Sequence, residues 1–225
     1  MLAVVSKVFE GFIDEQVNEY IGRYLSRYLC GYRKEYSPQT AMLFMIEKFK
    51  ESRDKGGCAA AVLMDLFKAF DTINHKLLIA KFRAYGFGIH SLEIIFDYLS
   101  DRWQRTKVNS TFSTSSLLLC GMAQGGKLGP KFFNIYLNDM FFEFVNTQVC
   151  NIADDTTIFA CGMELRNIIE RLENDITSVI YWFSANFMVL NAPKCHLLVS
   201  SPTTSRQQMY IEVGRLFGKV SAKYS

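Results

Sequence analysis

Three aspartates stand where carboxylates could share a metal ion. Asp65 follows the apolar run Cys58–Met64, and Asp154 and Asp155 stand side by side between two β-prone segments. Two carboxylates about 4 Å apart repel by roughly 4 kcal/mol at an effective dielectric near 20, so adjacent aspartates need solvent or a cation beside them. Oxygen-only ligation suits Mg²⁺, which usually takes one or two protein carboxylates together with substrate phosphates and water. These residue types therefore permit metal-dependent phosphoryl transfer.

A solvated turn is the competing interpretation of Asp154-Asp155, because aspartate is a preferred turn residue. A metal centre requires that the strand ending on Asp65 lie beside the hairpin that carries the pair. Two ions about 4 Å apart would then activate an attacking hydroxyl and stabilise a leaving pyrophosphate. Groups more than roughly 10 Å apart could not share an ion. The metal hypothesis therefore depends on this spatial prediction.

The elements that would position the aspartates alternate helices with hairpins. Apolar residues at helical spacing predict a helix over about 6–27, and Ser37-Pro38 predicts the start of another. The run 58–64 is short enough to be a buried strand. Further expected elements are helices at 77–82, 94–99, 132–144 and 164–186, hairpins at 103–119 and 148–160, and strands at 196–200, 209–213 and 216–220. This alternation favours an α+β fold over a doubly wound one.

Composition excludes several classes of protein. The 225 residues are 49% hydrophobic and 21% charged, which is typical of a folded chain rather than a disordered one. The net charge of +3 permits nucleic-acid binding without arguing for it. Six scattered cysteines without zinc-ligand spacing indicate reduced thiols. We expect a cytoplasmic or nuclear protein, or both, with no secretion signal, membrane segment or membrane partner.

Ordered sequence blocks carry a family resemblance. The blocks are AVLMDLFKAFD at 61–71, Gln124-Gly125 with Leu128-Gly129-Pro130, ADDTT at 153–157, Leu190-Asn191 with Lys194-Cys195, and a further block at 28–37. Their order, spacing and content together resemble the reverse transcriptases of non-LTR (LINE-like) retrotransposons. The likeness spans nearly the whole chain and weakens after about residue 202.

The resemblance implies a right-hand polymerase fold, with an antiparallel palm sheet packed on helices. Residues 1–57 would be a partial fingers subdomain. Residues 58–202 would be the palm, with fingers elements interleaved at about 86–130. Residues 203–225 would begin a truncated primer-grip region, with the thumb absent. We expect the chain to be a piece of a longer element protein whose thumb and endonuclease are missing here, or a degenerate copy of one.

The resemblance also implies site residues and partners. Two Mg²⁺ ions, or Mn²⁺ as an alternative, would be held by Asp65, Asp154, Asp155 and the backbone carbonyl of Leu66. The three aspartates would be catalytic. Lys194 would also be catalytic, by protonating the leaving pyrophosphate. Phe70 would be a steric gate that excludes the 2′-hydroxyl of the incoming nucleotide. Gln124 and Gly125 would line the dNTP pocket, and Arg33 would lie near the phosphates. The remaining partners would be an RNA template and a DNA primer.

Departures from the family pattern leave a second hypothesis open. Ile152 stands where an aromatic residue usually precedes Ala-Asp-Asp, Phe67 stands where a small residue follows Asp-Leu, and Glu35 replaces a glycine. The chain is therefore either an active RNA-directed DNA polymerase domain or a catalytically inactive remnant that binds RNA or protein.

Overall fold

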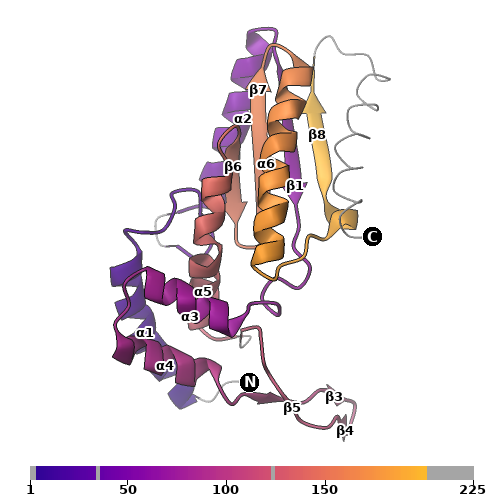
Figure 1. Cartoon of the computed structure of the whole chain (residues 1–225). Coiled ribbons are helices and arrows are strands. Elements are labelled where there is room, and N and C mark those ends of the chain that lie inside the picture. The colour runs from indigo at the N-terminus through magenta and orange to yellow at the C-terminus, as the bar shows by residue number, and fades with distance from the viewer. Residues whose placement is uncertain (1–3, 34–35, 123–124, 202–225) are drawn as a thin grey trace. The chain divides into compact units, whose positions relative to one another are not determined.

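The computed structural model describes residues 4–33, 36–122 and 125–201 (Figure 1). The chain forms two compact units, each built from two separate stretches. The helical unit comprises residues 1–25 and 68–136, and the sheet unit comprises residues 26–67 and 137–225. All six cysteines are free thiols, as expected. Within the described ranges, no helix combines the length and apolar character that crossing a bilayer requires.

A four-stranded antiparallel sheet in the order β6-β7-β1-β8 forms the centre of the sheet unit. Strand β1 (Cys58–Met64) pairs with β7 (Asp155–Gly162) on one side and with β8 (His196–Ser200) on the other, and β6 (Gln148–Ile152) is an edge strand. Six of the seven β1 residues are buried. Burial of both faces explains why this strand reads as a continuous apolar run.

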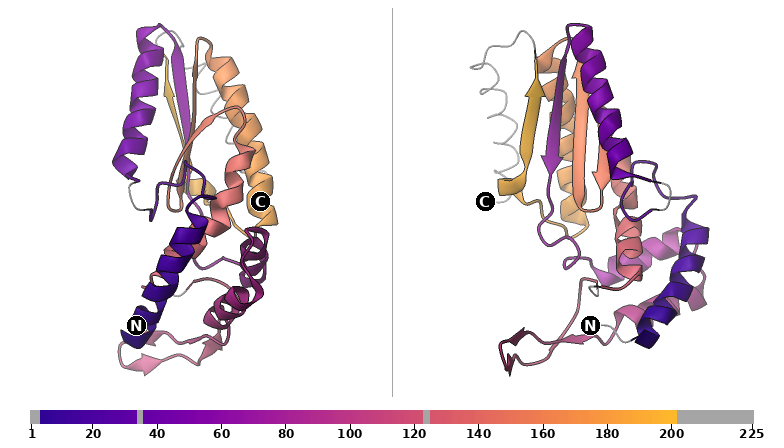
Figure 2. Two further views of the ribbon diagram at one scale, coloured as in Figure 1. Left: turned by 90° about the vertical axis from the view of Figure 1, so that its left-hand side faces the viewer. Right: turned by 180° about the vertical axis from the view of Figure 1, so that it is seen from behind.

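Helices α2 (Pro38–Asp54) and α6 (Leu165–Ala185) cover opposite faces of this sheet, as the left view of Figure 2 shows. Helix α6 buries eleven of its 21 residues and supplies most of the apolar contact on its face. Helix α2 has no buried residue and meets β7 through Phe44 and Phe49, whose rings lie 6.2 and 6.0 Å from that of Phe159. The two layers therefore differ sharply in how much apolar surface they bury.

A buried carboxylate on α6 determines where β6 begins. Asp175, only 1% exposed, accepts hydrogen bonds from the backbone N–H groups and the side chains of Asn146 and Thr147, at 2.6 to 3.3 Å. Arg171, one turn earlier, donates to the Asn146 carbonyl. One helix thus provides the hydrogen-bond partners for the backbone and side chains at the start of β6.

The helical unit contains α1 (Val4–Ile21), α3 (His75–Ala84), α4 (Ile89–Leu99) and all but the last residue of α5 (Leu128–Leu137). Its hairpin is formed by β2 (Trp103–Gln104), β3 (Lys107–Val108), β4 (Thr111–Phe112) and β5 (Ser116–Leu117). The fully buried rings of Phe82 and Phe132 pack edge to face, with centroids 4.9 Å apart. The side chain of Asn74 caps α3 by accepting from the Leu77 N–H.

Some predicted boundaries are wrong. The first helix ends at Ile21 instead of near residue 27, because Gly22 weakens its continuation and the following segment turns to pair with β6. The helix expected over 132–144 is α5 followed by the 3₁₀-helix η1 (Asn138–Glu143). The strands expected at 209–213 and 216–220 lie outside the described residues. The division into fingers and palm at residue 57 stays a prediction.

Replacing Asp175 by alanine should lower the free energy of unfolding by about 3 kcal/mol, because four donors at the start of β6 lose their acceptor. Urea denaturation measures this difference. Asn174→Ala, at an exposed neighbour on the same helix, is the matched control and should stay within about 0.5 kcal/mol of the wild type. Equal losses in both variants would contradict the assignment.

Candidate functional site

The two adjacent aspartates occupy different positions in the β6–β7 hairpin. The ladder continues to the pair Ile152↔Asp155, so only Ala153 and Asp154 lie between the strands. Ala153 has a φ of 60°, the left-handed conformation that two-residue hairpin turns need. We expected both aspartates in the turn; Asp154 is there, but Asp155 is the first residue of β7 because its backbone still belongs to the ladder.

The register of the sheet brings Asp65 to the same end as this hairpin. The last pair of the β1–β7 ladder is Met64↔Thr156, so the next position on each strand is Asp65 and Asp155. Burial raises the pKa of the Asp155 carboxyl, and the negative charges of Asp154 and then Asp65 raise it further, whereas Lys194 opposes the shift. The strand ending on Asp65 therefore lies beside the aspartate hairpin, as predicted.

Asp65 is held by the segment that precedes β8. The Asn191 side-chain amide donates to Asp65 Oδ2 at 2.6 Å, and the Asn191 backbone N–H donates to the Asp65 carbonyl at 2.8 Å. Lys194 Nζ lies 3.8 Å from the same Oδ2. Asn191 thus orients one carboxylate oxygen. In the sequence, Asn191 stands out only as part of a block, because its bond to Asp65 spans 126 positions.

The aspartate turn is supported from a second direction by residues 28–31. Leu29 pairs with Asn151 in parallel, and the Cys30 N–H donates to the Asn151 carbonyl at 3.0 Å. The buried Asn151 amide donates in turn to the Ala153 carbonyl at 2.9 Å. A Cβ on Gly31 would lie 2.5 Å from the Ala153 nitrogen, so only glycine fits there. The turn therefore depends on a close backbone contact that sequence reasoning missed.

Two other predicted residues of the sheet unit have structural contacts. Arg33 Nη1 donates to the Ser26 carbonyl at 2.6 Å, and its guanidinium lies 3.9 Å from the Tyr36 ring centroid. Leu66 lies opposite Leu190 in an isolated antiparallel bridge. The hydrogen bonds of this bridge are made by the backbone groups of the flanking residues, so the Leu66 carbonyl takes no part in them. Neither observation tests the assigned role, so both roles stay predictions.

The predicted nucleotide-binding residues Phe70 and Gly125 belong to the helical unit. The half-buried Phe70 ring stacks on Phe133 with centroids 4.4 Å apart and planes at 20°. Gly125 has a φ of 83°, a conformation that favours glycine. Gln124 lies outside the described residues. Their contact with a nucleotide stays a prediction.

The donor set at the Asp65 end of the sheet fits a hard divalent cation. Asp65, Asp154 and Asp155 offer only carboxylate oxygens, and burial, followed by the negative charges of Asp154 and Asp65, raises the pKa of Asp155. A cation would offset that repulsion. Among the described residues, however, no three His, Cys, Asp or Glu side chains already converge to ligand distances. The chemistry of the residues fits the ion, although the side chains are not arranged as a closed set of ligands.

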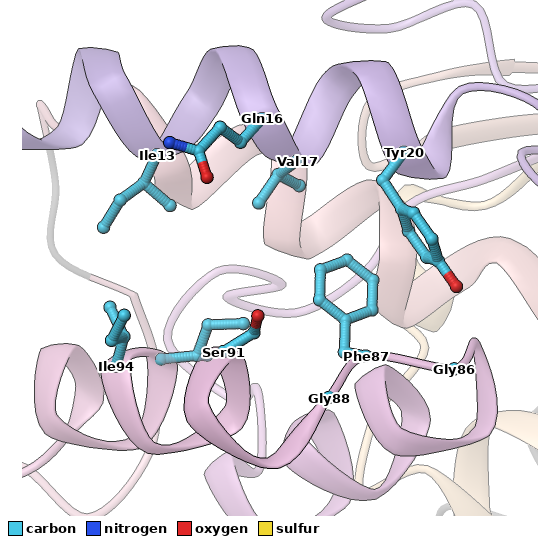
Figure 3. A pocket seen from close by; sticks show the side chains of 10 residues that line it. Ile13, Gln16, Val17, Tyr20, Gly86, Phe87, Gly88, Ser91 and Ile94 are labelled. Atoms are coloured by element: carbon cyan, nitrogen blue, oxygen red, sulfur yellow. The ribbon is translucent and has the colours of Figure 1, made fainter.

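A separate cavity of about 250 Å³ lies between α1 and α4 in the helical unit (Figure 3). Its walls are mainly apolar, with Ile13 and Val17 on α1 facing Phe87 and Ile94. Its lining contains no Asp, Glu, His, Lys or Cys, and the Tyr20 hydroxyl donates to the Tyr85 carbonyl. This cavity therefore offers no groups for acid–base or metal chemistry.

Sequence comparisons identify relatives over most of the chain. A family model described as reverse transcriptase (RNA-dependent DNA polymerase) matches residues 1–215. The Pol polyprotein of the type-1 retrotransposable element R2 of Popillia japonica is 26% identical over 179 residues, 74% of this chain and 28% of the relative. The probable RNA-directed DNA polymerase of transposon BS of Drosophila melanogaster is 25% identical over 203 residues, 86% of this chain and 22% of the relative. The chain thus spans only about a quarter of the length of these relatives.

Solved structures show a similar fold at low sequence identity. Telomerase of Candida tropicalis, in complex with a fragment of telomeric RNA, matches with a TM-score of 0.64 at 12% identity, over 90% of this chain and 34% of that chain. The apo enzyme without its C-terminal domain matches with a TM-score of 0.62 at 10% identity, over 89% of this chain and 42% of that chain. At this identity the likeness concerns the fold alone.

Gly31→Ala should destabilise the fold by about 2 kcal/mol, because the new Cβ would push against the backbone of the aspartate turn. Thermal and urea unfolding measure the loss. Gly162→Ala is the matched control in the same unit, since a Cβ there meets Ile168 at an ordinary 3.6 Å. If Gly31→Ala were no less stable than Gly162→Ala, the close contact would not exist in solution.

Proposed function

The chain belongs to the reverse transcriptase family, and on that premise we propose that it is the RNA-directed DNA polymerase domain of a non-LTR retrotransposon protein. It would join the 3′-hydroxyl of a primer to the α-phosphate of a deoxynucleotide on an RNA template, with release of pyrophosphate. The fold is of the expected α+β class, with an antiparallel sheet packed on helices, and resembles that of the telomerase structures. One observation carries the proposal: the register aligns Asp65 with Asp155, and Asp154 occupies the adjoining turn.

Polymerases of this family generally use a divalent metal. We propose Mg²⁺, as a pair of ions, with Asp65, Asp154, Asp155 and the Leu66 carbonyl as ligands and Mn²⁺ as an alternative. When bound, the metal supplies charge neutralisation at the transferring phosphoryl group and lowers the pKa of the attacking hydroxyl. The fit rests on the oxygen-only donors and on the mutual repulsion of the carboxylates, which Lys194 offsets only in part.

The protein residues around Asp65 would divide the remaining work. Asn191 would keep the Asp65 carboxylate in one orientation through its 2.6 Å hydrogen bond. Lys194, whose side chain is 71% exposed while its ammonium lies near Asp65, would reach the leaving pyrophosphate and donate a proton to it. Arg33 would contribute positive charge near the nucleotide phosphates.

Sugar selection would fall to Phe70. The Phe133 ring stacks on one face of the Phe70 ring, and this packing would restrict movement of the Phe70 side chain away from the sugar. Gln124 and Gly125 would line the pocket for the base and the template, where the absence of a Cβ at Gly125 permits a close backbone approach.

Asp154→Asn should reduce incorporation of dNTPs into a DNA primer on an RNA template by at least about a hundredfold in the presence of Mg²⁺, because a metal-binding carboxylate is neutralised. Asp97→Asn, at an exposed position on α4, is the control and should match the wild type. Equal incorporation by wild type and Asp154→Asn would remove the assigned role. Salt-dependent RNA binding by a wild-type chain that incorporates nothing would support the inactive-remnant hypothesis instead.

Phe70→Ala should raise the efficiency of ribonucleotide incorporation relative to deoxynucleotides by about tenfold or more, because removal of the ring makes room for a 2′-hydroxyl. The measurement is the ratio of kcat/KM for a matched NTP and dNTP. Phe142→Ala, at a phenylalanine that is 81% exposed, should leave that ratio unchanged. An unaltered ratio in Phe70→Ala would argue against the gate.

A further inference from the structure

A buried carboxylate in the helical unit contacts the loop that follows Gln124. Glu10 on α1 is only 1% exposed. Its Oε2 accepts a hydrogen bond from the Lys127 backbone N–H at 2.6 Å, and its Oε1 accepts one from the Tyr98 hydroxyl at 2.9 Å. One side chain therefore ties together α1, α4 and the residue that precedes α5.

The loop backbone is fitted closely around this carboxylate. A Cβ on Gly126 would lie 2.7 Å from Glu10 Oε2 and 3.1 Å from Cδ, so the carboxylate fills the space that a side chain would need. Gly125 has a positive φ of 83°. The two glycines serve different ends: Gly125 allows the turn of the chain, and Gly126 allows contact with Glu10.

Each oxygen of the Glu10 carboxylate accepts a hydrogen bond within the same unit. A buried carboxylate is costly unless hydrogen bonds satisfy it. Burial, and then the hydrogen bond to Glu10, raise the pKa of Tyr98, so the hydroxyl remains a donor at physiological pH. Lys127 Nζ lies 3.5 Å from the position that a Cβ on Gly11 would occupy, and Gly11 follows Glu10 on α1. Both the backbone and the side chain of Lys127 thus lie against this helix.

We propose that Glu10 is a positioning residue, which holds the Gly125–Lys127 loop in the conformation that binds the incoming nucleotide. This inference rests on the proposed function, in which Gln124 and Gly125 line the nucleotide pocket. A purely structural Glu10 would join α1 to α4 and affect stability alone. A positioning Glu10 would act through its hydrogen bond with the Lys127 N–H, so that loss of this bond would also weaken nucleotide binding.

Hydrogen exchange at the Lys127 amide measures how well its hydrogen bond to Glu10 protects it, and this measurement requires no enzymatic activity. Glu10→Ala should speed exchange at this amide by at least about tenfold, because its acceptor is lost. Glu10→Gln keeps an acceptor oxygen and Tyr98→Phe keeps the carboxylate, so each should stay within about threefold of the wild type. Glu19→Ala, at an exposed acidic residue on the same helix, is the matched control.

Nucleotide affinity is measured next, on the full chain with a dideoxy-terminated DNA primer annealed to an RNA template. The readout is the concentration of the correct dNTP that stabilises the ternary complex, which requires no chemical step. Glu10→Ala should raise this concentration about tenfold, whereas Glu10→Gln and Glu19→Ala should resemble the wild type. If Glu10→Ala does not fold, Gly126→Ala replaces it, since that variant displaces the loop and leaves the carboxylate in place.

The outcomes separate this inference from the proposed function. Faster Lys127 exchange together with weaker dNTP binding supports the positioning role, even if the wild-type chain then fails to extend a primer and the polymerase proposal falls. Unchanged exchange in Glu10→Ala, or faster exchange with unchanged dNTP binding, overturns it. A wild-type chain that binds no dNTP in this assay also overturns it.

Discussion

The antiparallel register between β1 and β7 is the constraint on which the rest of the site depends. Side chains alternate along a strand, so a slip of one residue would turn Asp65 to the opposite face from Asp155. The apolar content of β1 does not by itself select the register, because residues on both faces are apolar; the close packing of its six buried side chains in the core is what resists such a slip. The core therefore does more than stabilise the sheet: it aligns carboxylates that repel one another. Their repulsion opposes the fold that brings them together, and apolar burial offsets it.

Polar side chains in and beside the core hold the loops around it. Asn191 orients Asp65, Asn151 shapes the turn that carries Asp154, and Asp175 fixes the start of β6. In each case a side chain satisfies backbone or carboxylate groups that lie next to the core, where water would otherwise be needed. The same device appears in the helical unit, where Glu10 accepts from the Lys127 N–H. Apolar residues thus establish the sheet, and a few polar residues determine the shape of its loops.

Local patterns predicted the elements that carry strong periodicity. The bounds of β1 and β8, and the extent of α6 to within a residue, follow from apolar runs and helical spacing. The spatial association of Asp65 with the aspartate hairpin was a prediction that the metal hypothesis required, and the antiparallel sheet in which it occurs was implied by the family resemblance. The family likeness and the polymerase assignment came from ordered blocks rather than from any single residue.

Contacts between distant segments were not predictable in this way. Nothing near Gly31 in the sequence indicates that Ala153 lies against it, and nothing near Asn191 indicates a bond to Asp65. The placement of Asp155 in the strand instead of the turn follows from the Ile152↔Asp155 pair, which composition alone cannot specify. Helix α1 ends early for a similar reason, since residues after it are drawn into pairing with β6. Tertiary pairing decides these positions over local propensity.

Helix α2 buries little apolar surface, which affects the local stability of the sheet unit. Regions that bury little apolar surface open at low free energy without global unfolding. Helix α2 lacks any buried residue, whereas α6 is anchored along its whole length on the other face. Thermal fluctuation should therefore lift α2 away first and wet the ring of Phe159, while the β1–β7 ladder and the carboxylates at its end keep their alignment. The layer that loosens most easily thus carries none of the three aspartates.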